Sequence, residues 1–431
     1  MVQAVREAEA VFIPAIVAVG AAGVVTTALV PAAGDNQIQR IQVNLMDNVL
    51  NPLRRVFRSN QPIPQGIYHY KTTQDDPRNY RLHLRVEPDG LGVLIVNAAT
   101  VLRLNKTAIA YAYYLIQKQT PDQVASQMSR SYRVRPEQAR QDYQDFAGRI
   151  LSLLETPDLD PVTSLGAELT LPASGKISAP YRLDCAVTYR LPESANPDAA
   201  PNRRVDRELT TAEWQSVLDK AWQVGIPHVV FTGGEPTLRE DLPQLIAHAE
   251  TLGQVSGLLT DGLRLVDEAY LQSLLQTGLD HLMITLQPDN PDAWKALENV
   301  RAADIFDAVH LTVTPQNAGG IPELLKKLAE RQVQALSLSA STPELAKKLP
   351  ALYDQAAGLQ MEMIQDLPAP YSSVDPFTLE DQEMIQTKGA GRAWLYVEPD
   401  GDVLPTQGVN RLLGNILRDP WEIIWKAALS I

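Results

Sequence analysis

Short apolar runs alternate with stretches of helical periodicity along the C-terminal half of the chain. Runs typical of buried strands cover residues 183–190, 228–232, 257–260, 282–286, 310–314 and 335–339, and helical patterns cover 211–223, 242–252, 267–277, 291–299, 321–331 and 343–359. Six β/α repeats of this regularity predict a parallel sheet, either open or closed into a partial barrel. Such sheets bind ligands beyond the C-terminal ends of their strands, so we expect the functional residues there.

A smaller α/β unit is predicted upstream of these repeats. Residues 80–88 alternate between apolar and polar positions, Asp89-Gly90 is a typical hairpin turn, and residues 91–97 supply the return strand. Helical patterns follow at 105–117, from Thr120 onward and at 135–154. Thr120 followed by proline is typical of a helix N-cap and first turn.

An uncharged run covers residues 10–34, and its apolar core at 10–30 is 21 residues long. A helix rises about 1.5 Å per residue, so this core is long enough to cross roughly 30 Å of hydrocarbon. A secretory signal peptide is the alternative, but residues 1–9 hold one arginine and two glutamates and are not basic. Arginines are more numerous after the run than before it. The positive-inside rule therefore predicts a single-pass membrane protein with its large domain on the cytoplasmic side.

These patterns divide the chain into predicted segments. They are a membrane anchor helix at 1–34, a connector at 35–78, the small α/β domain at 79–155, a linker rich in Pro, Ser and Gly at 156–180, the barrel at 181–360 and a C-terminal extension at 361–431.

Composition excludes several classes of function. The chain has 38 Lys+Arg against 51 Asp+Glu, a net charge of −13, which argues against a general nucleic-acid binder. The single cysteine, Cys185, excludes an intramolecular disulfide and any site that needs two or more thiolates from this chain. We expect Cys185 to be a small buried hydrophobic residue. The six histidines are scattered, and we interpret them as structural.

A candidate ligand loop, Thr232-Gly233-Gly234-Glu235-Pro236, follows the second predicted strand of the barrel. Its two glycines let a backbone approach a ligand closely, and the carboxylate of Glu235 could pair with a ligand amine. Taken alone, the pentapeptide is equally compatible with an ordinary strand-to-helix turn.

In context, residues 178–350 resemble the peptide-modifying branch of the radical S-adenosylmethionine (radical SAM) enzymes. The resemblance rests on segments 187–190, 231–236, 260–262, 284–287 and 312–317, in that order. It implies that Gly233, Gly234, Glu235 and Pro236 form a vestigial SAM-binding loop.

Two further resemblances complete the predicted fold. Residues 101–108, residues 120–132 and the helix after them resemble the PqqD-like peptide-chaperone domain, which binds a precursor peptide as an added strand. Residues 395–405, 413–416 and two later tryptophans resemble a SPASM-type auxiliary-cluster extension. The predicted fold class is α/β: a partial (β/α)6 radical-SAM-like barrel with a PqqD-like winged-helix-type domain, a SPASM-like tail and one N-terminal transmembrane helix.

The sequence departs from the radical SAM family at its cluster ligands, which should be three cysteines spaced C-x₃-C-x₂-C after the first strand. In one register the three positions are Leu191, Ala195 and Asp198, and in the other they are Cys185, Tyr189 and Pro192. Neither offers three thiolates, and the side chains of leucine, alanine and proline have no donor atom. Lys388 and Thr406 stand where cysteines of the auxiliary cluster are expected.

Three hypotheses of function follow. The first is a non-catalytic radical-SAM-like pseudoenzyme, anchored in the membrane as a binding or scaffold subunit whose partners are membrane protein subunits. The second is a peptide-binding accessory protein in ribosomal-peptide maturation. The third is a SAM-binding enzyme without an iron–sulfur cluster. On the first, no catalytic residue, metal or cofactor is expected, and neither a 4Fe–4S cluster nor a nucleic-acid partner; vestigial SAM binding stays open.

Overall fold

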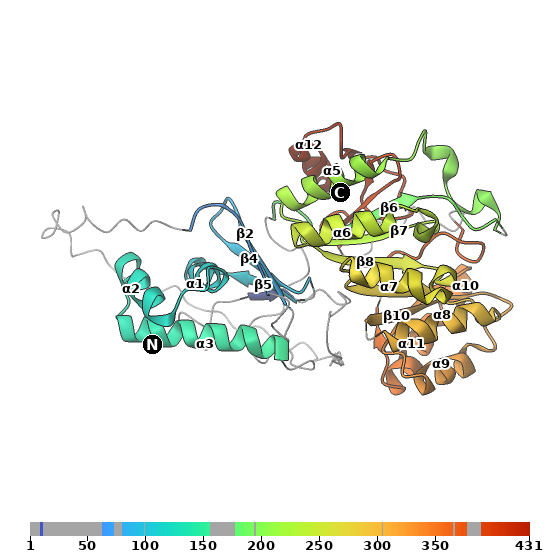
Figure 1. Ribbon diagram of the computed structural model, residues 1–431, viewed down its shortest axis with the longest axis horizontal. Helices are drawn as coiled ribbons and strands as arrows, with labels where there is room; N and C mark the ends of the chain where they lie inside the picture. The colour runs from blue at the N-terminus through green and yellow to red at the C-terminus, as the bar shows by residue number, and fades with distance from the viewer. Residues whose placement is uncertain are drawn as a thin grey trace, which may run out of the picture.

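The protein has two lobes in the computed structural model, a smaller N-terminal domain and a larger α/β body (Figure 1). The structure describes residues 9–11, 63–72, 80–98, 100–155, 177–193, 195–303, 305–364, 367–376 and 389–431.

The N-terminal domain is built on an antiparallel sheet of strand order β1-β5-β4-β3-β2. The strands are β1 Glu9–Val11, β2 Gly66–Lys71, β3 Arg81–Val86, β4 Gly92–Val96 and β5 Thr100–Leu104. The predicted hairpin is confirmed: β3 and β4 pair around a turn in which Gly90 has φ +78°, a left-handed conformation that favours glycine. Strand β2 was not predicted, since it lies inside the expected connector.

Helices follow the sheet, and the cap predicted at Thr120 is present. They are α1 Lys106–Ile116, α2 Pro121–Ser131 and α3 Pro136–Glu155. The side chain of Asn105 accepts from two backbone N–H groups of α1, and Thr120 forms a capping box with Gln123 at the start of α2.

The two faces of the N-terminal sheet bury different partners. Leu82, Leu84 and Leu94 belong to a core that the sheet shares with α1 and with Ile150 of α3. Side chains at alternate positions, including Val93 and Ile95, join the core of the larger body. The sheet is therefore enclosed between its own helices and the body, because successive residues of a strand point to opposite faces.

The larger body contains a sheet of order β12-β11-β10-β9-β8-β7-β6-β13-β14-β15. Its strands are β6 Arg182–Thr188, β7 His228–Gly233, β8 Val255–Thr260, β9 His281–Thr285, β10 Phe306–Val313, β11 Ala335–Ala340, β12 Glu362–Met363, β13 Trp394–Val397, β14 Asp402–Leu404 and β15 Gly414–Asn415. Strands β6 to β12 pair in parallel with their sequence neighbours. Each of the six strands predicted for the barrel is confirmed, with small shifts of the ends.

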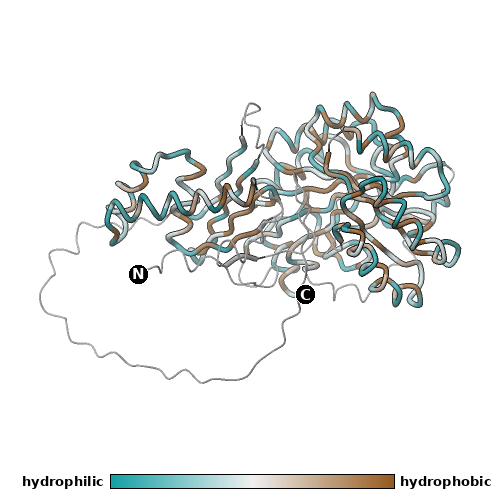
Figure 2. Tube along the Cα trace, turned by 90° about the horizontal axis from the view of Figure 1, so that it is seen from below, coloured by the Kyte–Doolittle hydropathy of each residue, from teal (hydrophilic) through white to brown (hydrophobic). Residues whose placement is uncertain are grey.

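The helices between these strands are α5 Thr211–Gln223, α6 Leu242–Leu252, α7 Glu268–Gln276, α8 Pro291–Ala302, α9 Ile321–Glu330, α10 Pro343–Ala346 and α11 Leu349–Gly358. They lie along one side of the sheet (Figure 1). Right-handed crossovers between neighbouring parallel strands place every helix on the same face. This arrangement is an α/β fold with a parallel sheet, as the sequence predicts. Apolar strand segments lie inside the lobe, and the helices turn polar positions outward (Figure 2).

The C-terminal segment extends the same sheet. Strand β13 pairs in parallel with β6, β14 and β15 follow as antiparallel strands, and the chain ends in helix α12 Trp421–Leu429. The indole N–H groups of Trp421 and Trp425 donate to the backbone carbonyls of Ser178 and Ile177, at the entry to β6. The tail is therefore an integral part of the body.

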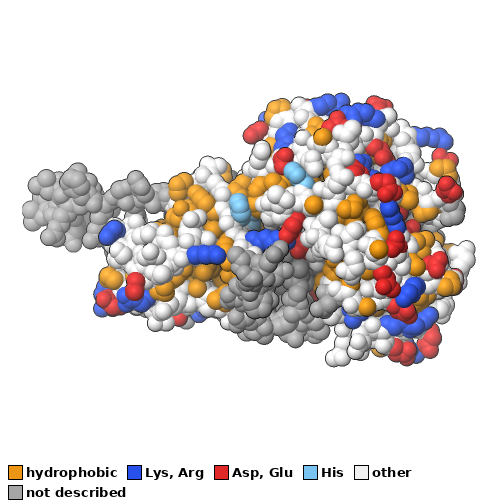
Figure 3. Space-filling model, in the orientation of Figure 1, with side chains coloured by type: hydrophobic (Ala, Val, Ile, Leu, Met, Phe, Trp, Pro, Cys, Tyr) orange, Lys and Arg blue, Asp and Glu red, His pale blue; other side chains and the backbone are white. Residues whose placement is uncertain are grey.

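Buried polar contacts join the N-terminal domain to the end of the body where its parallel strands begin. The Arg85 guanidinium donates to the backbone carbonyls of Ala179 and Gly225 at 2.9 and 3.0 Å, and its Nε donates to Glu87 at 2.8 Å. Arg81 forms ion pairs with Asp280 and Glu250. Basic, acidic and histidine side chains gather along this boundary on the face shown in Figure 3.

The predicted membrane location is wrong. No helix within the described ranges is long and apolar enough to cross a membrane. The start of the uncharged run forms strand β1, which pairs with β5, and residues 12–34 lie outside the described residues. Uniform apolarity does not distinguish a helix from a strand, so the pattern alone was an insufficient basis for an anchor.

Candidate functional site

The loop after β7 lies directly against the backbone that follows β6. The N–H groups of Gly234 and Glu235 donate to the carbonyls of Thr188 and Arg190, both at 2.9 Å. Gly233 has φ +126°, and a Cβ atom on Gly234 would lie 2.3 Å from the Arg190 carbonyl oxygen. Both glycines are therefore needed for the close packing of the chain on itself, and their predicted role in binding a ligand stays a prediction.

Substituting Gly234→Ala is expected to lower the free energy of unfolding by about 1–3 kcal/mol. The added methyl group would clash with backbone atoms, and a change of side-chain rotamer cannot relieve such a clash. Urea denaturation measures the change. Gly148→Ala in α3 is the matched control: nothing lies within 4 Å of the added Cβ, and we expect a gain of about 0.5–1 kcal/mol. Equal stability of the Gly234 variant and the wild type would contradict the close packing.

Glu235 is buried at the C-terminal end of the strands and accepts hydrogen bonds from three neighbours. Its carboxylate accepts from the N–H of Thr237 at 2.9 Å, from the hydroxyl of Thr260 at 2.7 Å and from the N–H of Asp261 at 2.7 Å. Burial, followed by the negative charge of Asp261, raises the pKa of Glu235 to about 8. Burial also raises the pKa of Asp261.

The arginines near Glu235 and Asp261 form ion pairs with other carboxylates. Arg239 forms an ion pair with Asp241 at 2.7 Å, and Arg264 forms one with Glu240 at 3.0 Å. Within the described part of the chain, neither Glu235 nor Asp261 forms an ion pair with a lysine or arginine. Two neighbouring buried carboxyl groups without a cation fit a ligand that carries an ammonium group.

The loop after β6 places the three expected cluster positions in different surroundings. Leu191 packs against a buried cluster that contains Tyr189 and Tyr371. Ala195 donates its N–H to the carbonyl of Pro192, and the exposed Asp198 forms an ion pair with Arg203 at 3.2 Å. Of the three side chains only that of Asp198 has a donor atom, and it pairs with Arg203, so these positions supply no set of cluster ligands.

The second register, which begins at Cys185, and the expected auxiliary-cluster positions of the C-terminal segment were also compared with the structure. Cys185 is fully buried in β6, as predicted for a small apolar residue, and burial raises the pKa of its thiol. Thr406 accepts a hydrogen bond from the indole of Trp394 at 3.1 Å. Lys388 lies outside the described residues.

A buried polar network that the sequence did not reveal joins the β6 loop to the tail. The hydroxyl of Tyr189 donates to Glu398 Oε1 at 2.8 Å, and Arg204 pairs with the same oxygen at 2.7 Å. Tyr189 and Glu398 are 209 residues apart in the chain, so no local pattern could have indicated the contact.

The described histidines have structural surroundings. His228 begins β7 and His281 begins β9, on either side of β8, and their Nε2 atoms lie 2.8 Å apart. Burial lowers the pKa of both rings. His310 was expected at the start of its strand, but β10 begins at Phe306, and the ring lies 3.0 Å from the hydroxyl of Ser337.

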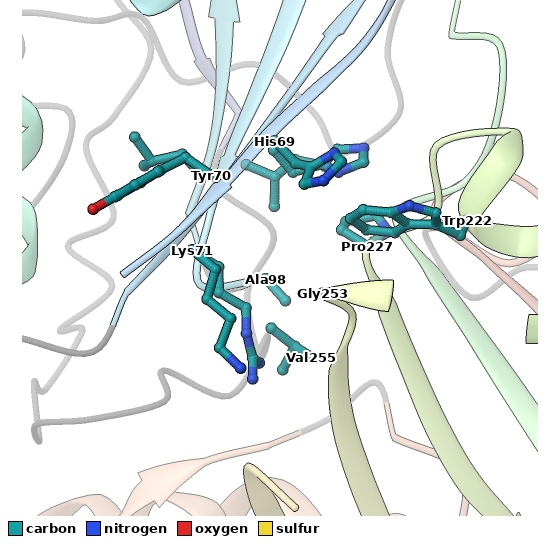
Figure 4. A pocket seen from close by; sticks show the side chains of 12 residues that line it. His69, Tyr70, Lys71, Ala98, Trp222, Pro227, Gly253 and Val255 are labelled. Carbon is teal, nitrogen blue, oxygen red and sulfur yellow. The ribbon is translucent and has the colours of Figure 1, made fainter. Parts of the chain in front are cut away.

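A hollow lies between the N-terminal domain and the body (Figure 4). In the close-up, His69 and Trp222 point toward each other across it, and their rings lie 4.8 Å apart, edge to face. His83, which pairs with His69 across strands, is buried next to the same indole, and burial lowers its pKa to about 3. The hollow is at the opposite end of the strands from Glu235, and sequence reasoning did not find it.

Comparisons with known proteins agree with this fold. Residues 185–313 match the family profile described as the radical SAM superfamily. PqqA peptide cyclase of Streptomyces rochei is 29% identical over 290 residues, covering 60% of this chain and 79% of the relative. PqqA peptide cyclase of Xanthomonas oryzae pv. oryzae (strain MAFF 311018) is 27% identical over 249 residues, 52% of this chain, and the chain spans 66% of that relative's length. The chain therefore contains a radical SAM domain with homology to PqqA peptide cyclase.

Solved structures extend the likeness over most of the chain. Streptococcus suis SuiB bound to precursor peptide SuiA has a TM-score of 0.54 at 16% identity, covering 83% of this chain and 88% of SuiB. SuiB bound to S-adenosylmethionine has a TM-score of 0.52 at 16% identity, covering 82% and 88%. At this identity the likeness shows the fold alone.

These findings bear on the expectations about cofactors and partners. SAM and a 4Fe–4S cluster are the cofactors of the radical SAM family, and a matched SuiB structure holds SAM, so the expectation of no cofactor is wrong for the matched domain. Membrane protein partners have no support from these comparisons, and one of the matched SuiB structures is bound to its own precursor peptide SuiA.

The chain's own residues fit the two cofactors differently. The carboxyl groups of Glu235 and Asp261 fit the ammonium group of SAM. The single cysteine is buried in a strand and cannot supply three thiolates, and among the described residues no group of three His, Cys, Asp or Glu side chains could hold a metal ion. The residues present therefore do not fit the cluster.

Proposed function

We propose that this chain binds a precursor peptide in the maturation of ribosomally made peptides, with the N-terminal domain, residues 63–155, as its PqqD-like peptide-binding module. Homology to PqqA peptide cyclase and the fold shared with SuiB support the proposal. The proposal assigns binding to the chain and no reaction step, since the residues present do not fit the cluster that starts radical SAM chemistry.

The observation that carries the proposal is the edge of the N-terminal sheet at β5, which pairs with a strand from outside the hairpin unit. One face of the sheet packs on α1 and the other on the body, so a peptide can pair only at an edge strand. Strand β5 is the last strand of the hairpin unit, and a strand from a distant part of the sequence already pairs with it. The edge of β5 is therefore competent for strand addition.

Calorimetric titration of the full chain with precursor peptides encoded beside its gene tests this function. We expect a dissociation constant in the micromolar range for one of them and no binding for a scrambled peptide of the same composition. The absence of binding by every candidate at high micromolar concentration would contradict the proposal.

The carboxyl pair supports a second candidate function, binding of SAM at the loop of Gly233, Gly234, Glu235 and Pro236. Glu235 and Asp261 share a buried site without a protein cation, and an ammonium group would supply one. When bound, SAM offers the family a methyl-sulfonium group and a source of radicals. In this chain Glu235 would orient the methionyl amine, and its neighbours Thr237 and Thr260 would hold the carboxylate in place.

Substituting Glu235→Gln is expected to weaken SAM binding at least about tenfold, because the amide keeps the shape but removes the charge that faces the ammonium group, and tenfold corresponds to about 1.4 kcal/mol. Calorimetry with SAM measures the change. Glu298→Gln, an exposed site on α8, is the matched control and should bind as the wild type does. Equal affinity of the two variants would exclude Glu235 as the amine partner.

A further inference from the structure

The edge of β5 is occupied by the chain's own N-terminal strand. Strand β1 pairs antiparallel with β5, with Glu9 opposite Arg103, Ala10 opposite Leu102 and Val11 opposite Val101. Among the described residues the next strand after β1 begins at Gly66, so the two strands are separated by more than 50 residues of sequence. Without β1, β5 would be the outer strand of the sheet.

This edge also presents an arginine without a complete set of partners. Leu102 and Leu104 point to the core shared with α1, whereas Val101 points to the body. Arg103 lies on the same face as Val101 because the two are two residues apart. Its Nε and Nη2 atoms are buried, and no described group accepts a hydrogen bond from them. A guanidinium with two unpaired nitrogen atoms beside the β5 edge fits a carboxylate on a strand that pairs there.

We propose that β1 is a resident strand in the peptide-binding edge of β5, and that an extended acidic peptide displaces it by placing a carboxylate at the position of Glu9, opposite Arg103. The inference rests on the proposed peptide-binding function and adds a mode of control and a selectivity residue to it.

The length of the strands favours displacement. Strand β1 pairs with three residues of β5, whose full length is five residues, Thr100–Leu104. A longer peptide strand can use the backbone groups of all five, and each additional hydrogen bond adds roughly 0.5–1.5 kcal/mol. The resident strand has the advantage of being tethered, but a long connection lowers its effective concentration. The edge is thus protected from unspecific pairing and remains open to a better-matched strand.

Fluorescence anisotropy with a labelled copy of residues 3–14 as the probe tests the proposal. The full chain should bind this probe weakly, because its own strand competes. Ala10→Pro removes a backbone donor from the centre of β1 and should raise the affinity for the probe at least about tenfold. Adding Arg103→Glu to that variant should reverse the gain. Equal affinity of the wild type and the Ala10→Pro variant would overturn the proposal.

Cross-linking tests the pairing independently of the probe. Glu9→Cys combined with Arg103→Cys should form a disulfide under mild oxidation, detected by mass spectrometry, because the two positions are directly opposite. The native cysteine is buried and does not compete. Glu9→Cys with Lys118→Cys, at the exposed end of α1, is the matched control and should remain reduced. Equal cross-linking of both pairs would contradict the resident strand.

Titration of both proteins with precursor peptides distinguishes failure of this inference from failure of the proposed function. If the Ala10→Pro variant binds the residue 3–14 probe but no precursor peptide, the proposed function fails and the resident strand stands. If a precursor peptide binds the wild type and the Ala10→Pro variant with equal affinity, the proposed function stands and the displacement mechanism fails.

Discussion

Substituting Arg85→Met is expected to lower the free energy of unfolding by about 3–5 kcal/mol, among the largest effects available at the junction of the two lobes. Arg85 and Glu87 are both 2% exposed, and the ion pair between them is tied by further hydrogen bonds to the backbone of the body. Removing the guanidinium leaves the carboxylate of Glu87 buried without its countercharge. It also leaves the carbonyls of Ala179 and Gly225 without a donor.

Urea denaturation followed by tryptophan fluorescence measures this loss. Arg140→Met is the matched control, because its pair with Asp122 is exposed at 43% and 78% and is expected to contribute about 0–1 kcal/mol. The double variant Arg85→Met with Glu87→Leu should recover much of the loss, since it removes the unpaired charge. A cost at Arg85 no larger than the cost at Arg140 would show that the junction does not depend on this ion pair.

Local sequence patterns were sufficient to predict the helices and parallel strands of the larger body. Helix α5 was predicted at the bounds that the structure shows because its apolar positions repeat with helical period, and in the structure a capping box of Thr210 and Glu213 begins it. The parallel strands were found because they are buried on both faces and appear as short apolar runs. In both cases neighbouring residues carry the information.

The junction between lobes and most of the site could not be predicted, since they depend on contacts between distant residues. Strand β2 mixes polar and apolar residues because His69 packs on Trp222 of the body, more than 150 positions away. The loop at Gly233 was predicted correctly as a strand-to-turn transition. However, the hydrogen bonds of Glu235 with Thr260 and Asp261 need the packing of β7 against β8.

The predicted membrane anchor shows that a clear local pattern can also give a wrong prediction. Residues 10–34 satisfy every local criterion for a spanning helix, but the strand formed by Glu9–Val11 depends on an edge elsewhere in the chain. A hydropathy pattern records what a segment can bury, whereas its partner decides which structure it adopts.

Substituting Glu235→Gln is expected to remove a large part of the pH dependence of stability between pH 4.5 and 8. The folded-state pKa of about 8 lies above the ordinary value of 4.5, so the folded protein holds a proton that the unfolded chain has lost in this range. Stability due to this group is therefore present below pH 4.5 and is lost as the pH rises through 8. At about 1.4 kcal/mol per pKa unit, the loss is on the order of 3–5 kcal/mol.

Urea denaturation of the wild type and the Glu235→Gln variant at a series of pH values measures this effect together with its coupling to Asp261, because buried carboxyl groups that do not interact with Glu235 contribute equally to both proteins. Burial raises the pKa of Glu362 to about 6 and that of Asp375 to about 7, and these slopes cancel in the difference. We expect the Gln variant to gain on the wild type steadily from pH 5 to pH 9, while Glu298→Gln follows the wild type throughout. A constant difference across that range would mean that Glu235 is ionised in the folded protein at neutral pH, and would remove the argument that its buried carboxyl site awaits a cation.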